Sequence, residues 1–152
     1  MVYCRVRFWT LPYQLTLETD VNPTESRILV VEDYPDLRRL TVMMLNGLGY
    51  PTVETAGDGV EALERLRISR YHFVLSDVNM PRMNGFMLLR AIKSDAALCH
   101  LPVLIMSTHP EEQYSEAAIL CRAVGYLMKP FLPAALDGII KRALADLAEP
   151  HG

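Results

Sequence analysis

The sequence predicts an α/β domain in which helices cover both faces of an open, doubly wound parallel sheet of five strands. Along residues 27–147, short apolar runs alternate with amphipathic stretches that have the helical period. Several of the runs are apolar throughout, which is typical of strands buried on both faces of a parallel sheet. Right-handed crossovers then place the strands in one sheet flanked by five helices.

The first strand and the first helix are expected between residues 27 and 49. Residues 28–31 (ILVV) form an apolar run that is too short for a helix. The following stretch, PDLRRLTVMMLNGLG, has apolar residues at helical spacing. We expect its inward face to consist of Leu37, Leu40, Met44 and Leu48. Gly49 can end this helix in a left-handed conformation.

The next two strands enclose a second helix. YPTVETA alternates apolar and polar residues, which predicts a less buried edge strand. In AGDGVEALERLRISR, Asp58 and Glu61 have the spacing of a capping box. The expected inward stripe of this helix is Val60, Leu63 and Leu66. HFVLSD then predicts a buried third strand.

The remaining elements continue the alternation to residue 147. Asn84 is expected to cap a helix in GFMLLRAIKSD. PVLIMS predicts a buried fourth strand. EEQYSEAAILCRA predicts a weaker helix that is polar in its first half, and GYLMK predicts a short fifth strand. The inward residues of the third and last helices are expected to be Phe86, Leu89, Ile92, Leu136, Ile140, Ala143 and Leu147.

Composition excludes several classes of protein. A net charge of −3 gives no basic surface of the kind that nucleic-acid binding leaves, and no helix-turn-helix is predicted. No apolar run approaches the roughly 18 residues of a membrane span. The three cysteines are odd in number and widely spaced. We therefore expect a cytoplasmic protein in which each cysteine is an apolar filler, without disulfides or zinc.

Three segments are expected along the chain. Residues 1–26 lie outside the α/β pattern, residues 27–147 form the domain, and residues 148–152 form a tail. The first segment alternates apolar and polar residues twice, so a small hairpin and an irregular extension both remain open. We assign it no function.

Charged and polar side chains follow four of the predicted strands. Glu32 and Asp33 end the first strand, Asp77 the third, Ser107 the fourth and Lys129 the fifth. Because the carboxyl ends of parallel strands meet at one edge of the sheet, these side chains are expected to share a site. Three close carboxylates repel each other unless a cation lies among them. The lack of His or Cys ligands disfavours zinc, and the small number of side-chain ligands favours Mg²⁺ over calcium.

The same set of side chains suits phosphoryl transfer. A lysine ammonium and a serine hydroxyl can bind the oxygens of a phosphoryl group, and the central carboxylate, Asp77, can act as the nucleophile. Taken singly, each residue has a plainer interpretation as a strand-end turn or a surface charge. The coincidence at all these strand ends favours the site.

Four motifs carry a resemblance to a known family. They are VVED (30–33), SDVNMPRMNG (76–85), LPVLIMST (101–108) and GYLMKPF (125–131). In this order and spacing, they make residues 27 to about 147 similar to the receiver domains of two-component response regulators, the CheY-like fold. The resemblance implies the strand order 2-1-3-4-5. It also implies a signalling module that is no enzyme beyond its own phosphoryl transfer and autodephosphorylation.

The resemblance implies a role for each site residue. Asp77 would accept a phosphoryl group from a histidine kinase or phosphotransfer protein. Mg²⁺ would be held by Asp33, Asp77 and the carbonyl of Asn79, with Glu32 acting through water.

Further roles concern the response to phosphorylation. Ser107 and Lys129 would bind the phosphoryl group, and the bond from Lys129 to Pro130 would be cis. Tyr126 would be the aromatic switch that moves with Ser107, although plain packing remains an alternative for it. Asn79 and His109 lie where the family tunes the lifetime of the phosphate. The fourth helix, fifth strand and fifth helix would then bind a downstream protein, an output domain or a second copy of the chain.

Two other functions compete with this interpretation. A haloacid-dehalogenase-like phosphatase also uses an aspartate after a strand, but it needs a second aspartate where this chain has Asn79. A degenerate receiver that only dimerises is disfavoured by the intact set of site residues. The chain departs from the family at Ser107, where Thr is commoner. It also departs at Arg122, where Gly is frequent; this departure concerns the exit from the fourth helix and not the phosphorylation chemistry.

Overall fold

A computed structural model describes residues 22–109 and 122–148 of the chain. Five parallel strands form one sheet in the order β2-β1-β3-β4-β5, which confirms the predicted order. The strands are β1 (Arg27–Val31), β2 (Thr52–Ala56), β3 (Phe73–Asp77), β4 (Val103–Ser107) and β5 (Gly125–Met128). The helices in the described residues are α1 (Pro35–Gly47), α2 (Gly59–Ile68), α3 (Gly85–Ser94) and α5 (Pro133–Ala148).

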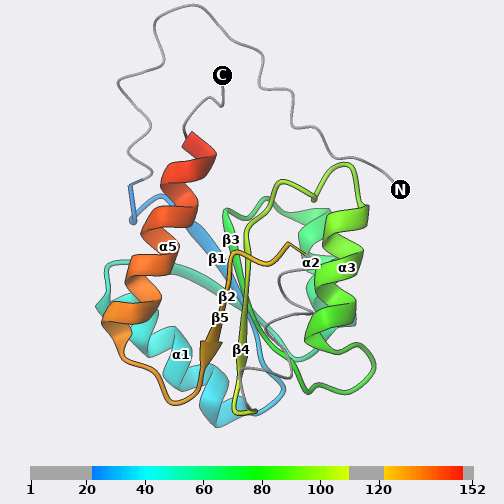
Figure 1. The fold of residues 1–152 in the computed structure, drawn as a ribbon, viewed down its shortest axis with the longest axis horizontal. Coiled ribbons are helices and arrows are strands. Elements are labelled where there is room, and N and C mark those ends of the chain that lie inside the picture. Colours follow the sequence, from blue (N-terminus) through cyan, green and yellow to red (C-terminus); the bar gives the residue numbers. More distant parts are fainter. Residues whose placement is uncertain (1–21, 110–121, 149–152) are drawn as a thin grey trace, which may run out of the picture.

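The helices cover the sheet on both sides (Figure 1). Helices α1 and α5 lie against one face, and α2 and α3 lie against the other. The central strands therefore lie between two apolar layers, which explains why their sequences are apolar throughout. The edge strand β2 is only partly buried, as its alternating sequence predicts.

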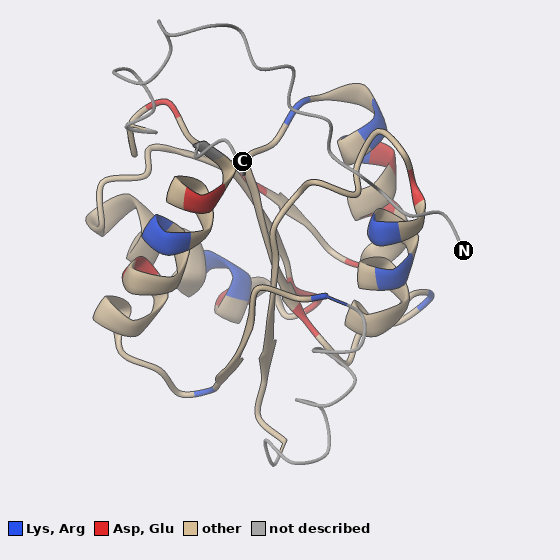
Figure 2. Ribbon diagram, turned by 45° about the horizontal axis from the view of Figure 1, so that its top comes forward, with Lys and Arg blue, Asp and Glu red and all other residues tan. Residues whose placement is uncertain are grey.

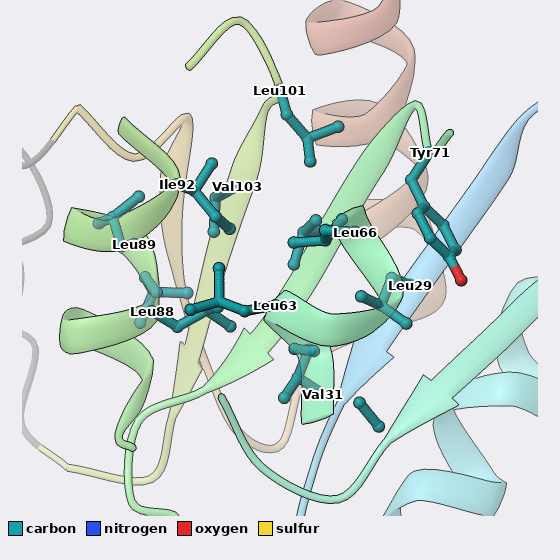
Figure 3. Close-up of a cluster of buried hydrophobic side chains, with 14 of the residues drawn as sticks. Leu29, Val31, Leu63, Leu66, Tyr71, Leu88, Leu89, Ile92, Leu101 and Val103 are labelled. Atoms are coloured by element: carbon teal, nitrogen blue, oxygen red, sulfur yellow. The ribbon is translucent and has the colours of Figure 1, made fainter. Parts of the chain in front are cut away.

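Alternate residues of β1 enter two separate cores. Leu29 and Val31 pack with residues of α2 and α3, in the cluster shown in Figure 3. Ile28 and Val30 pack on the opposite face with residues of α5. Each of these four side chains is fully buried. Because side chains alternate along a strand, burial on both faces holds β1 in one register relative to its neighbours.

The inward face of α1 differs from the prediction. Leu37 and Leu40 are 42% and 58% exposed, so the assignment of these two residues to the core is wrong. Thr41 and Leu45 are buried instead. Of the predicted residues, Met44 and Leu48 pack against the core. Apolar residues occur on more than one side of this helix, and hydropathy alone did not show which side faces the sheet. Thr41 is accepted in the core because its hydroxyl donates to the Leu37 carbonyl, at 3.0 Å.

The predicted helix starts are confirmed. Asp58 Oδ1 accepts a hydrogen bond from the Glu61 backbone at 2.9 Å, and Asn84 Oδ1 accepts one from the Met87 backbone at 2.8 Å. The Glu61 side chain departs from an ideal capping box, because it accepts from the backbone of Gly57 rather than from that of Asp58. The other inward faces agree with the prediction, except that Val60, Phe86 and Leu147 are only partly buried.

Some predictions fall outside the described residues or need correction. The possible hairpin of the first segment and nearly all of the helix expected at 111–123 lie outside the described residues. Cys99 takes part in a disulfide, so the expectation of unpaired cysteines is wrong for this residue. Within residues 22–109 and 122–148, no helix has both the length and the hydropathy needed to span a membrane.

Candidate functional site

The acidic residues predicted to form a site meet at the carboxyl edge of the sheet. Strands β1 and β3 are direct neighbours, with Val31 beside Ser76, so the residues that follow them lie side by side. Glu32, Asp33 and Asp77 each place one carboxylate oxygen within 4.8 Å of the others. Figure 2 shows acidic segments at the centre of the molecule, where the strands end.

Lys129 joins this cluster from the end of β5. Its Nζ lies 2.7 Å from Glu32 Oε2 and 3.3 Å from Asp77 Oδ1. Its backbone N–H donates to the Ser107 carbonyl at 2.8 Å, which continues the β4–β5 pairing by one residue. The bond between Lys129 and Pro130 is cis, as the family resemblance implies. The Lys129 ammonium thus contacts two of the three carboxylates.

Glu32 is the most deeply buried member of the cluster, with 1% of its surface exposed. Its two oxygens are occupied by the Tyr34 backbone N–H at 3.2 Å and by Lys129. Burial raises the pKa of the Glu32 carboxyl and the nearby Asp77 charge adds to the effect, while the bond to Lys129 opposes it. With both oxygens already bonded, Glu32 is better placed to contact a cation through water than directly.

Asp33 differs from Glu32 in its hydrogen bonding. In the part of the chain that the structure describes, its Oδ1 is a buried oxygen without a hydrogen-bond partner. A buried acceptor that lacks a partner is unfavourable unless another group satisfies it. The Asp33 carboxylate belongs to the group of three carboxylates. The donor set is all oxygen, so it fits a hard divalent cation such as Mg²⁺.

The hydroxyl expected at the end of β4 lies in a small network around His109. Ser107 Oγ accepts from the His109 backbone N–H at 3.0 Å, and Tyr126 Oη donates to the His109 carbonyl at 3.0 Å. The His109 ring nitrogen Nδ1 lies 3.2 Å from Asn79 Nδ2. The structure therefore connects Ser107, His109, Tyr126 and Asn79, which come from three different segments.

One further residue shapes the edge of the site. Arg38 on α1 donates to the Glu32 carbonyl at 2.8 Å and holds the backbone just after β1. Sequence reasoning missed this residue, because nothing in the pattern separates it from its neighbour Arg39. Arg122, noted as a departure from the family, lies before β5, at the opposite edge of the sheet from the site. Its φ is 63°, the left-handed conformation that glycine adopts most readily.

The fold and the site together define a receiver-type signalling domain. The profile of the response regulator receiver domain matches residues 28–141. The chain is 37% identical over 110 residues to the chemotaxis protein CheY-3 of Vibrio cholerae, covering 72% of this chain and 85% of that protein. It is 35% identical over 116 residues to the chemotaxis protein CheY of Pseudomonas aeruginosa, covering 76% and 94%.

A solved structure shows the same architecture. The signal receiver domain of a signal transduction histidine kinase from Syntrophus aciditrophicus superposes with a TM-score of 0.75 at 28% identity, covering 84% of this chain and 96% of that one. The chain therefore belongs to the response regulator receiver domain family. Members of this family act in phosphorylation-activated signalling and are not classical enzymes.

Proposed function

We propose that this protein is a signalling receiver in which Asp77 accepts a phosphoryl group, with Mg²⁺, from a phosphohistidine of a histidine kinase or phosphotransfer protein. The observation that carries the proposal is the group of carboxylates from Glu32, Asp33 and Asp77, in which the buried Asp33 Oδ1 lacks a hydrogen-bond partner among the described residues. A divalent cation would satisfy that oxygen and relieve the repulsion between the carboxylates. Asp33, Asp77 and the Asn79 carbonyl would hold the ion, with Glu32 acting through water.

The reaction follows from the position of Asp77. One of its carboxylate oxygens attacks the phosphorus, a P–O bond forms, and the P–N bond to the donor histidine breaks. The electron pair of that bond returns to the imidazole nitrogen, so the donor leaves as a free histidine. Lys129 already contacts Asp77 Oδ1, and its ammonium can also pair with the phosphoryl oxygens. When bound, Mg²⁺ neutralises charge that develops on these oxygens.

Phosphorylation changes the charge next to Ser107. The added phosphoryl group carries about −1.5 to −2 charge. The Ser107 hydroxyl can donate to one of its oxygens, and this movement would break its bond with the His109 backbone. Because the Tyr126 hydroxyl is bonded to the carbonyl of the same His109, the change can reach β5. Repacking of the surface around β5 and α5 would then favour a partner that prefers the phosphorylated state.

Asn79 and His109 are placed to influence the lifetime of the phosphate. Their side chains meet at 3.2 Å, and each residue belongs to a loop that follows a strand of the site. A water molecule that hydrolyses an acyl phosphate on Asp77 has to approach past such groups. We therefore propose that this pair controls access of water.

The test is labelling with a small phosphoryl donor. The wild-type protein, incubated with acetyl phosphate and Mg²⁺, should take up one phosphoryl group per chain, measured by intact mass. Asp77→Asn should remain unlabelled. Asp36→Asn, which changes an exposed carboxylate at the start of α1, should label like the wild type. Labelling of Asp77→Asn would refute the assignment, and repeated turnover of p-nitrophenyl phosphate by the wild type would indicate a phosphatase instead.

A further inference from the structure

An ion pair outside the carboxylate cluster joins α2 to the loop that follows β3. Both Nε and Nη2 of Arg82 lie 2.7 Å from Asp58 Oδ2. The other oxygen of the same carboxylate, Oδ1, caps α2 through the Glu61 backbone. Asp58 is buried, with 11% of its side chain exposed, so its orientation is set by the helix that it caps. The Asp58 carboxylate is thus held in a fixed position to pair with Arg82.

The backbone of Arg82 is in an uncommon conformation. Its φ is 62°, in the left-handed region that side chains other than Gly, Asn and Asp rarely adopt. Such a conformation persists only where surrounding contacts hold it. In the described residues, the hydrogen bonds and ion pairs of this side chain are those with Asp58, which can therefore help to hold the backbone conformation.

A second contact presses the same loop against α2. A Cβ at Gly59 would lie 2.6 Å from Met83 Cγ and 2.9 Å from the Met83 carbonyl oxygen, so only glycine allows this approach. The Gly59 backbone N–H donates to that carbonyl at 3.3 Å. Neighbouring residues of the loop, Arg82 and Met83, are therefore both attached to the first turn of α2.

The loop is also held at its other end. A Cβ at Gly85 would lie 2.1 Å from the Asp77 carbonyl oxygen, and the Gly85 backbone N–H donates to the Val78 carbonyl at 2.8 Å. Asn79 lies between these two attachments, directly after Val78. The path of its backbone therefore depends on the contacts at both ends of the loop.

We propose that Asp58 and Arg82 are positioning residues that hold the loop after β3 in the conformation in which the Asn79 carbonyl binds the cation. This inference rests on the proposed function, because it takes the cation at Asp77 to be Mg²⁺. The Arg82 side chain is 61% exposed, and an exposed ion pair contributes little to global stability. Its main effect is therefore on the loop, and hence on metal affinity.

The experiment measures Mg²⁺ affinity by calorimetry in the full chain. Arg82→Asn removes the cation but tolerates the left-handed backbone. Asp58→Asn keeps an oxygen to cap α2 but removes the charge. Arg82→Lys keeps a cation. The matched control is Arg65→Gln, which breaks the 3.0 Å ion pair with Glu61 on the outer side of the same helix.

The expected result is a loss of Mg²⁺ affinity of about 10-fold in Arg82→Asn and in Asp58→Asn, the lower end for groups that orient metal ligands. The double variant should be no weaker than either single variant, because the two residues act as a unit. Arg82→Lys should recover part of the affinity, and Arg65→Gln should match the wild type. At saturating Mg²⁺, labelling by acetyl phosphate should return to the wild-type rate in every variant.

The outcomes separate the inference from the function on which it rests. If the wild type binds no Mg²⁺, the proposed function itself fails. If the wild type binds Mg²⁺ and the Arg82 and Asp58 variants bind it equally well, the inference alone is overturned. Additive losses in the double variant, or an equal loss in Arg65→Gln, would also overturn it. Urea unfolding without Mg²⁺ checks that each variant is folded during the titration.

Discussion

Neutralising Asp33 should stabilise the metal-free protein and remove its response to Mg²⁺. One Asp33 oxygen lies within 4.8 Å of an oxygen of Glu32 and of Asp77, and within residues 22–109 and 122–148 the buried Asp33 Oδ1 has no hydrogen-bond partner. Asp33→Asn removes the charge and leaves the shape of the side chain almost unchanged. An amide is also easier to bury than an unpaired carboxylate.

The size of the effect follows from the distances. At the upper limit of 4.8 Å between these oxygens, two unit charges repel by about 1 kcal/mol in water and by about 3.5 kcal/mol at an effective dielectric constant of about 20. Lys129, which contacts Glu32 and Asp77, offsets part of this repulsion. We therefore expect Asp33→Asn to raise the free energy of unfolding without metal by about 1–2 kcal/mol.

Urea unfolding with and without Mg²⁺ measures both parts of the prediction. The wild type should gain about 2.7 kcal/mol at a Mg²⁺ concentration 100 times the dissociation constant, because only the folded state binds the ion. Asp33→Asn should gain almost nothing under the same conditions. The two proteins should therefore exchange their order of stability when Mg²⁺ is added.

Asp36→Asn is the matched control. Asp36 lies near Asp33 in the sequence, but its side chain is 93% exposed, in the first turn of α1. Its loss should lower stability by a few tenths of a kcal/mol through the helix dipole and leave the gain from Mg²⁺ intact. The reasoning is refuted if Asp33→Asn is less stable than the wild type without metal, or if it retains the full gain from Mg²⁺.

Three further predictions concern stability alone. Lys129→Ala should destabilise the metal-free protein by about 3 kcal/mol in urea unfolding, because it leaves the buried Glu32 carboxylate without the Lys129 ammonium. An effect below about 1 kcal/mol, typical of a surface ion pair, would contradict this prediction. Gly138→Ala should stabilise the protein by about 0.5–1 kcal/mol, since among the described residues its Cβ meets nothing within 4 Å inside α5. Gly85→Ala should destabilise the protein, since its Cβ would lie 2.1 Å from the carbonyl oxygen at the end of β3. Thermal unfolding compares the two variants, and shifts of the same sign would contradict the prediction. Burial lowers the pKa of Lys93 from 10.5 to about 8, so between these pH values the unfolded chain binds more protons than the folded chain, and the free energy of unfolding should rise with pH. Lys93→Met should weaken that rise, as measured by urea unfolding. An unchanged pH profile would show that Lys93 titrates normally.

The order of the described elements and the grouping of the three carboxylates could be predicted because both depend on local signals. A continuous apolar run such as residues 28–31 indicates a strand buried on both faces. The side chains after each strand could be assigned to one site because parallel strands end at the same edge of a sheet. Capping by Asp58 and Asn84 was likewise visible, since a cap depends on residues only a few positions apart.

Contacts between distant segments could not be predicted in the same way. The inward face of α1 depends on how that helix sits against the sheet, so the hydropathy of Leu37 and Leu40 gave the wrong side. The partner of Arg82 lies 24 residues away, and no local pattern connects it with Asp58. The joint contact of Lys129 with Glu32 and Asp77 likewise appeared only once β5 was placed in the sheet.

By itself, the sequence determined which segments become strands and helices and which residue types stand where the strands end. These properties depend on hydropathy, backbone preference and spacing within a single segment. Only the tertiary structure decided that Asp33 Oδ1 lacks a partner among the described residues while both Glu32 oxygens accept a hydrogen bond, and that Arg82 pairs with Asp58 at the start of α2. Hydrogen-bond satisfaction and ion pairing act over a few ångströms, so they depend on three-dimensional distance rather than on separation along the chain.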